Sequence, residues 1–230
     1  MRRPSLTPPP SREHTDEVSK ETETVTAYDW MGGRVWVRDS ARRALLVIEL
    51  FADESVRPEQ KALWLPHMMF ADPWAAHEAA RGDYEAMVAD IAWDAYGIDV
   101  TGARCAGSGA AAFDWAEDAS RIRASLMSAY GLDWDGASRG LSFCDLCGLL
   151  GSLMETAESS PFSEAVSARL AKPPAPTKWN KEEREALEAR KRHFALKTGG
   201  ADPVEAANTE AADSFAAALA AAKRKAARNG

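Results

Sequence analysis

The chain has little cysteine and no long apolar run, and each shortage excludes a class of protein. Only three of its 230 residues are cysteine, an odd and small number that excludes a disulfide framework. The longest apolar run, ALLVIELF at 44–51, is interrupted by Glu49 and is far shorter than the roughly 20 residues of a membrane span. The first 24 residues contain no apolar core of a secretory signal. We therefore expect a cytoplasmic protein.

The sequence also lacks the residue patterns that hold a cofactor, a metal ion or a phosphate. Cys144-x-x-Cys147 is the most suggestive pattern, but it lies in a segment typical of a helix, without the βαβ context of a redox pair or the further ligands of a zinc site. The Gly-rich stretches at 32–33 and 107–109 lack the Lys-Ser/Thr of a phosphate loop. We interpret the cysteines as buried small hydrophobic residues, with a metal or redox role as the alternative.

Four aspartates near two expected helix ends are the remaining candidates for catalysis. Asp114, Asp118, Asp133 and Asp135 would need a cleft and separated pKa values to act as a general acid and base. The simpler interpretation is that Asp114 caps a helix and that Asp133 and Asp135 form a turn. We expect no enzyme and no cofactor.

Composition divides the chain into a central domain and two tails. The content of 46% hydrophobic and 27% charged residues is typical of a globular protein, and the net charge of -7 argues against nucleic acid as the main partner. Residues 1–24 are rich in Pro, Ser, Thr and charge, which predicts disorder. We expect one domain over 25–198, followed by an Ala-rich helix or tail over 199–230.

The apolar spacing predicts a mostly α fold with a short N-terminal β-hairpin. The hairpin pairs residues 25–30 with 34–37, and Gly32-Gly33 supplies the positive φ of its turn. Caps are expected at Asp72, Ser142 and Asn180. Helices are expected over 40–53, 55–70, 72–97 (one or two helices), 114–131, 142–154, 160–171, 180–196 and 202–228.

One phrase occurs twice, as DAYGIDV at 94–100 and SAYGLDW at 128–134. A duplication would extend the match upstream, where it is absent. We interpret the phrase as the same helix stop used twice. In that stop Gly97 or Gly131 adopts the left-handed conformation, and the next residue, Ile98 or Leu132, packs back on the last turn.

Tryptophan and basic residues give the candidate surfaces. We expect most of the eight tryptophans to be buried, with Trp134 and Trp179 partly exposed. The basic runs at 188–197 and 221–228 follow acidic helical sequence, so we interpret them as solvated helix ends that complement the helix dipole. Contact with nucleic acid is the alternative.

Residues 113–134, FDWAEDASRIRASLMSAYGLDW, resemble a motif of the bacteriophage gene product fifteen family. The motif consists of an aromatic-Asp-aromatic start, an Asp on the next turn, an Ile and a Tyr-Gly-Ile/Leu-Asp ending. Residues 30–53 are similar to the family's N-terminal hairpin and first helix, residues 141–153 to the helix after the motif, and residues 180–196 to its closing helix, in the family's order. The chain departs from the family in lacking the second aromatic of a Trp-Trp pair near Ser142-Phe143, in a long loop and in its tails.

The resemblance implies a tail assembly chaperone that acts in the host cytoplasm. Its partner would be the tape-measure protein, with the tail-tube protein as a further candidate, and self-association stays open. A minor tail component retained in the virion and a helical nucleic-acid-associated protein are the alternatives. We expect the client in a groove formed by 113–134 and 141–154. The candidate partner-binding residues are Trp115, Tyr130, Trp134, Phe143 and Trp179.

Overall fold

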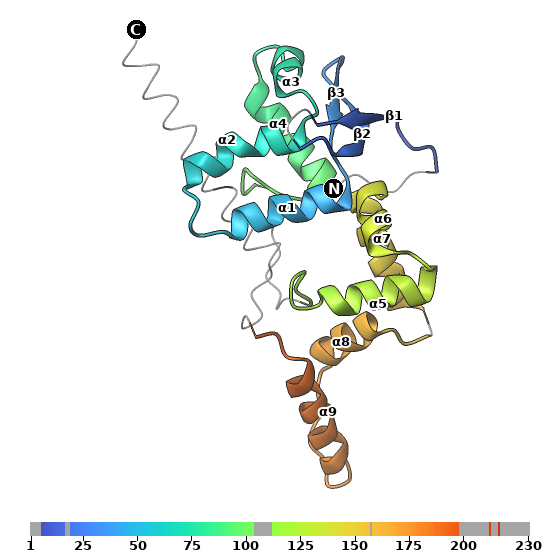
Figure 1. The fold of residues 1–230 in the computed structure, drawn as a ribbon. Helices are drawn as coiled ribbons and strands as arrows, with labels where there is room; N and C mark the ends of the chain where they lie inside the picture. Colours follow the sequence, from blue (N-terminus) through green and yellow to red (C-terminus); the bar gives the residue numbers. More distant parts are fainter. Residues whose placement is uncertain are drawn as a thin grey trace. The chain divides into compact units, whose positions relative to one another are not determined.

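The computed structural model describes residues 6–16, 19–103, 112–156 and 158–197, together with Ala212 and Ala216. These residues form nine helices and one small antiparallel sheet, so the prediction of a mostly α fold is confirmed (Figure 1). The expected helix over 202–228 lies outside the described residues apart from those two alanines.

The chain divides into two compact units. The first unit comprises Met1–Gly107, Asp135–Gly148 and Val204–Gly230, and the second comprises Ser108–Trp134 and Leu149–Pro203. The expected single domain over 25–198 stays a prediction, and each unit is described separately.

The sheet of the first unit has three strands where two were expected. Its order is β1 (Ser11–Thr15), β2 (Thr22–Trp30) and β3 (Gly33–Val37), and Thr26 lies opposite both Ser11 and Val37. The prediction of disorder over 1–24 is therefore wrong for β1. Polar contacts hold this strand, because the buried Arg38 guanidinium binds Asp16 at 2.9 Å and His14 Nε2 at 3.2 Å. Composition alone could not reveal such partners.

The hairpin turn lies one residue earlier than predicted. Met31 and Gly32 have φ angles of 42° and 80°, the pair of positive values that a two-residue hairpin turn requires, whereas Gly33 is the first residue of β3. Gly33 is needed for space, because a Cβ there would lie 3.0 Å from the carbonyl oxygen of Ala79. The turn thus packs closely against the end of α3 (Pro73–Ala79).

Helices complete the first unit. They are α1 (Ala41–Ala52), α2 (Pro58–Met69), α3, α4 (Tyr84–Tyr96), α6 from Asp135, and the first part of α7 (Phe143–Glu155). Two predicted caps are confirmed. The Asp72 carboxylate accepts from the N–H groups of Trp74 and Ala75, and the Ser142 hydroxyl accepts from the N–H of Asp145. The turn expected at 133–135 is instead the start of α6 (Trp134–Gly140).

The first unit buries side chains of its sheet and helices in one core. Val25, Val37, Phe51 and Met87 are buried. Two polar groups reach backbone carbonyls within this core. The Tyr96 hydroxyl donates to Arg38 O at 2.8 Å. Lys61 Nζ donates to Phe51 O at 2.8 Å in the last turn of α1, where a cation complements the helix dipole.

The second unit contains α5 (Ala119–Tyr130), the rest of α7, α8 (Pro161–Leu170) and α9 (Lys181–Phe194). Helix α5 begins five residues later than predicted. Asn180 precedes α9 but does not cap it, because its amide bonds to Thr177 N and Ala175 O in the preceding linker.

The repeated phrase is the predicted helix stop in both places. Gly97 and Gly131 end α4 and α5 with φ angles of 68° and 66°. The N–H of Ile98 returns to Ala92 O, and that of Leu132 returns to Leu126 O, both at 3.3 Å. The N–H groups of Gly97 and Gly131 donate to Trp93 O and Met127 O at 2.9 and 3.0 Å, the bond expected of a left-handed glycine cap.

Replacing Gly131 with alanine tests this stop. A Cβ at Gly131 meets no neighbouring atom within 4 Å, so the cost of Gly131→Ala comes from the left-handed backbone alone, and the change should lower the free energy of unfolding by about 1 kcal/mol. The matched control is Gly151→Ala within α7, where the added Cβ is equally uncrowded and should raise it by about 0.5 kcal/mol. Urea unfolding measures both, and equal shifts would contradict the assignment.

Candidate partner-binding surface

A buried carboxylate joins the helices of the second unit. Asp118, which is fully buried, accepts hydrogen bonds from Arg169 at 2.6 and 2.9 Å and from Arg121 at 2.7 Å. The N–H of Asp114 donates to it at 3.1 Å. Arg169 also donates to Phe194 O at 2.6 Å and to Ala112 O at 3.1 Å. One ion pair therefore joins the start of α5, helix α8 and the end of α9.

The hydrogen bonds to Asp118 outweigh the cost of its burial. Desolvation alone would raise the pKa of this carboxyl. Hydrogen bonds from Arg169, from the backbone of Asp114 and from Arg121, together with the charge of Arg169, lower the pKa below its usual value of 3.8. Asp118 is thus held ionised as a structural anion.

Phe113 and Trp115, which precede Asp118 in the motif 113–134, pack against each other and Phe113 packs against α8. Phe113 meets Trp115 edge-on at 4.9 Å and Phe162 at 5.4 Å between ring centroids. Asp114 accepts from the N–H groups of Ala116 and Glu117 at 2.8 and 2.7 Å, and so shapes the turn before α5. Residues 113–118 therefore contribute ring packing, a turn and a buried carboxylate to the second unit.

The structure does not bring the five predicted partner-binding residues onto one surface. Trp115 and Tyr130 are half-buried, and the Tyr130 hydroxyl donates to Leu149 O at 3.2 Å. Trp134 is half-buried beneath the guanidinium of Arg123, 5.7 Å from its ring centroid. Phe143 belongs to the first unit and is only 2% exposed, so it is a core residue. Trp179, 94% exposed, is the one available for contact over its whole surface.

Other apolar side chains are exposed on the second unit besides Trp179. They come from α5, α7 and α8, and they are Met127, Met154 and Leu170. Leu126 is buried, whereas the next residue, Met127, is exposed, so α5 directs these two apolar residues to different faces. Spacing identified the buried face, and residues off that spacing carry the exposed surface.

Sequence reasoning missed the exposed apolar residues of the first unit. Leu63 and Trp64 on α2, Trp74 on α3 and Met31 in the hairpin turn are all exposed. The sequence of α2 carries a signal of this exposure, because its apolar residues surround the helix instead of forming one stripe. In addition, its Lys61 is buried. A helix that is apolar on two faces has one face available for a partner.

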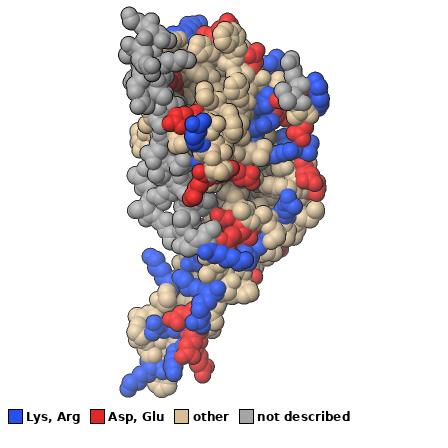
Figure 2. Space-filling model, turned by 60° about the vertical axis from the view of Figure 1, so that its left-hand side comes forward, with Lys and Arg blue, Asp and Glu red and all other residues tan. Residues whose placement is uncertain are grey.

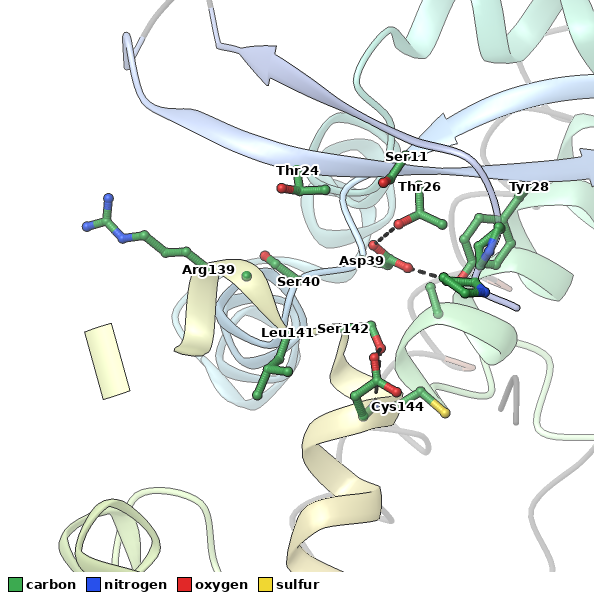
Figure 3. A pocket seen from close by; sticks show the side chains of 15 residues that line it. Ser11, Thr24, Thr26, Tyr28, Asp39, Ser40, Arg139, Leu141, Ser142 and Cys144 are labelled. Atoms are coloured by element: carbon green, nitrogen blue, oxygen red, sulfur yellow. Dashed lines mark hydrogen bonds between the residues drawn. The ribbon is translucent and has the colours of Figure 1, made fainter. Parts of the chain in front are cut away.

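A cavity of about 190 Å³ lies in the first unit (Figure 3). Asp39 lies at its wall and accepts from the hydroxyls of Thr26 at 2.8 Å and Tyr28 at 3.4 Å. Ser11, Thr24, Ser40, Ser142 and Cys144 also line it. The polar side chains that line this cavity can form hydrogen bonds. Those of Thr26, Tyr28 and Asp39 already bond to one another and connect β2 to the segment before α1.

The thiol of Cys147 on α7 lies in an environment that disfavours its ionisation. Burial and the neighbouring Cys144 raise the pKa of Cys147 to about 12, so this thiol stays protonated at neutral pH. Within the described ranges, no three His, Cys, Asp or Glu side chains gather as a metal site. No helix in that part of the chain is long and apolar enough to cross a membrane.

Helix α9 presents charge instead of apolar surface. It buries no side chain, begins with Glu182 and Glu183 and ends with Lys191, Arg192 and His193, as predicted. Acidic and basic side chains both appear over this helix in the lower part of Figure 2. Such a helix is stabilised by the interaction of its terminal charges with the helix dipole and by the contacts at its C-terminal end.

Removing Arg169 should destabilise the protein more than removing a surface arginine. Arg169→Met leaves the Asp118 carboxylate buried with fewer partners, and we expect a loss of about 3 kcal/mol in the free energy of unfolding. The control is Arg190→Met, which breaks the exposed pair with Glu164 and should cost less than about 1 kcal/mol. Chemical denaturation measures both, and similar losses would refute the structural role of Asp118.

The effect of Arg169→Met should shrink as the pH falls. Because the folded-state pKa of Asp118 is lowered, its contribution to stability is present above the usual value of 3.8 and is lost as the pH falls through the lower folded value. The difference in unfolding free energy between wild type and variant should be largest near pH 7 and smaller at about pH 3. A pH-independent difference would contradict this.

Comparison with models of protein families shows to which family the chain is related. The family model described as Bacteriophage Gp15 protein matches residues 22–196. Searches among curated proteins and among solved structures found no match. The match includes both the 113–134 motif, with its buried Asp118, and the N-terminal sheet from β2 onward. The chain therefore belongs to the bacteriophage Gp15 protein family.

Proposed function

We propose that the chain is a tail assembly chaperone that binds the tape-measure protein during tail morphogenesis in the host cytoplasm. The observation that supports this is the large apolar side chains exposed on both units, above all Trp179. The family places the chain in a bacteriophage context. The proposal includes no catalytic step. The buried polar groups of the second unit, Asp118 and Arg169, hold its helices together.

The exposed side chains suit a client with apolar helical segments. Methionine is flexible and adapts to varied partners, and Met127 and Met154 supply this chemistry on α5 and α7. Tryptophan provides rigid apolar area of the kind that dominates binding energy, and Trp179 supplies it beside α9. A chaperone surface of this kind covers the client until tail-tube subunits replace it.

Trp179 and Leu170 offer the most direct test. Co-expression with the tape-measure protein of the same phage should keep that protein soluble, and affinity pull-down should recover both chains. Trp179→Ser and Leu170→Ser together should reduce the recovered tape-measure protein about tenfold, because hot-spot side chains carry most binding energy. Arg190→Met, an exposed change in the same unit, is the control.

Two results would contradict the proposal. If the tape-measure protein is equally insoluble with and without this chain, it is not a client. If instead the chain is found in purified virions in stoichiometric amount, a structural tail component replaces the chaperone as the function.

A further inference from the structure

An aromatic series runs from the core of the first unit to its surface. The buried Phe70 ring lies 6.4 Å from Tyr84, Tyr84 lies 5.0 Å from His77, and His77 stacks on Trp74 at 6.1 Å with an interplanar angle of 20°. We call these four residues the aromatic ladder. Trp74, its outermost member, is 74% exposed.

The ladder holds Trp74 in a defined position even though it is exposed. Pro73 is the first residue of α3, and Asp72 accepts from the N–H of Trp74 at 3.0 Å, so the backbone at Trp74 is fixed. The stack on His77 restrains the indole ring, and the contact of Tyr84 with Phe70 connects that stack to the core. An exposed aromatic side chain that is already ordered loses little entropy when a partner covers it.

Carboxylate residues precede, follow and alternate with the ladder residues in the sequence. Glu78 lies one helical turn after Trp74 on the same face of α3, and Asp83 and Glu85 flank Tyr84 in sequence. All three are exposed, and within the described part of the chain none of them forms an ion pair. We call these three residues and Asp72 the acidic rim; Arg81 is the single Lys or Arg of the segment 70–85.

We propose that the aromatic ladder and its acidic rim bind a Lys- or Arg-bearing segment of the client. This inference rests on the proposed function and assigns one part of the contact to the first unit. A guanidinium or ammonium group over the Trp74 indole gains a cation–π interaction, and the rim supplies the opposite charge. The same chain shows such contacts internally, with Arg12 4.3 Å over the ring of Trp36.

Charge selects this occupant over a purely apolar one. An apolar helix placed on Trp74 would cover Glu78 and Asp83 without giving them partners, and burying unpaired carboxylates is costly. A basic segment gives each carboxylate a counter-ion while its aliphatic stem packs on the indole. The surface is therefore selective for amphipathic basic sequence.

The test compares two changes in the ladder site with a change at another exposed tryptophan. Trp74→Ala removes the indole, and the double variant Glu78→Gln/Asp83→Asn removes rim charge. Asp83 precedes α4 without forming a side-chain cap, so its neutralisation breaks no capping bond. The control is Trp64→Ala on α2, where no stack of this kind is present among the described side chains. Each full-length variant is co-expressed with the tape-measure protein, and its thermal midpoint is compared with wild type.

The expected result is a weaker, less salt-sensitive complex. Trp74→Ala should reduce the recovered tape-measure protein about tenfold. The double variant should reduce it several-fold at low salt and remove most of the decrease that added salt causes in wild type. Trp64→Ala should retain more client than Trp74→Ala.

The possible failures are distinguishable. If wild type retains the client and Trp74→Ala retains it equally well with an unchanged thermal midpoint, this inference is wrong and the chaperone function stands. If the rim variant keeps the salt dependence of wild type, the occupant is not basic and the inference is also wrong. If wild type does not retain the client, both the proposed function and this inference are wrong.

Discussion

The second unit depends on one carboxylate that has no access to water. Asp118 is tolerated there because Arg169, 51 residues later in the chain, and Arg121 bring donors to both of its oxygens. Arg169 in turn holds the last carbonyl of α9, 25 residues beyond it. Contacts this far apart in sequence close long loops, and their strength has to offset the entropy that loop closure costs. The family motif 113–134 supplies Asp118 and Arg121 of this arrangement, and Arg169 comes from outside it.

Motif residues and exposed apolar residues are therefore different sets. Trp115 and Tyr130 belong to a distinctive sequence, but both are half-buried, and the Tyr130 hydroxyl donates to Leu149 O. Met127 is exposed between motif positions on α5, and Leu170 is exposed outside the motif at the end of α8. In this chain the recognisable motif shows how the core of the second unit is built, and it does not coincide with the exposed apolar residues.

Local signals predicted the helices well and the connections poorly. Gly97 and Gly131 end their helices as expected because a left-handed glycine stop is decided within a few residues. Strand β1 and the turn at Met31 were missed because both depend on partners elsewhere: Arg38 for β1, and the close approach of Gly33 to Ala79 for the turn. Asn180 has the composition of a cap, but a competing bond to the linker removes it from that role.

The same distinction explains the candidate surfaces. The exposure of Trp179 could be anticipated from its place after a proline-rich linker, whereas the burial of Phe143 required the backbone contact between Phe143 N and Asp39 O, which closes the first unit around α7. The aromatic ladder could not be found from sequence. Trp74 and His77 share a face of a short helix, but Tyr84 joins them only through the turn that connects α3 to α4.

Helix α9 buries no side chain, and its bonds to the rest of the second unit lie near its last turns, where Phe194 O accepts from Arg169 and Lys191 donates to Ala171 O. Opening this helix exposes little apolar surface, so its free energy of opening is lower than that of the whole unit. We therefore expect amide hydrogens in its first turns to exchange by local fraying, and those near Asp118 to exchange only when the unit unfolds. On this argument the less stable part of the second unit is the one adjacent to Trp179.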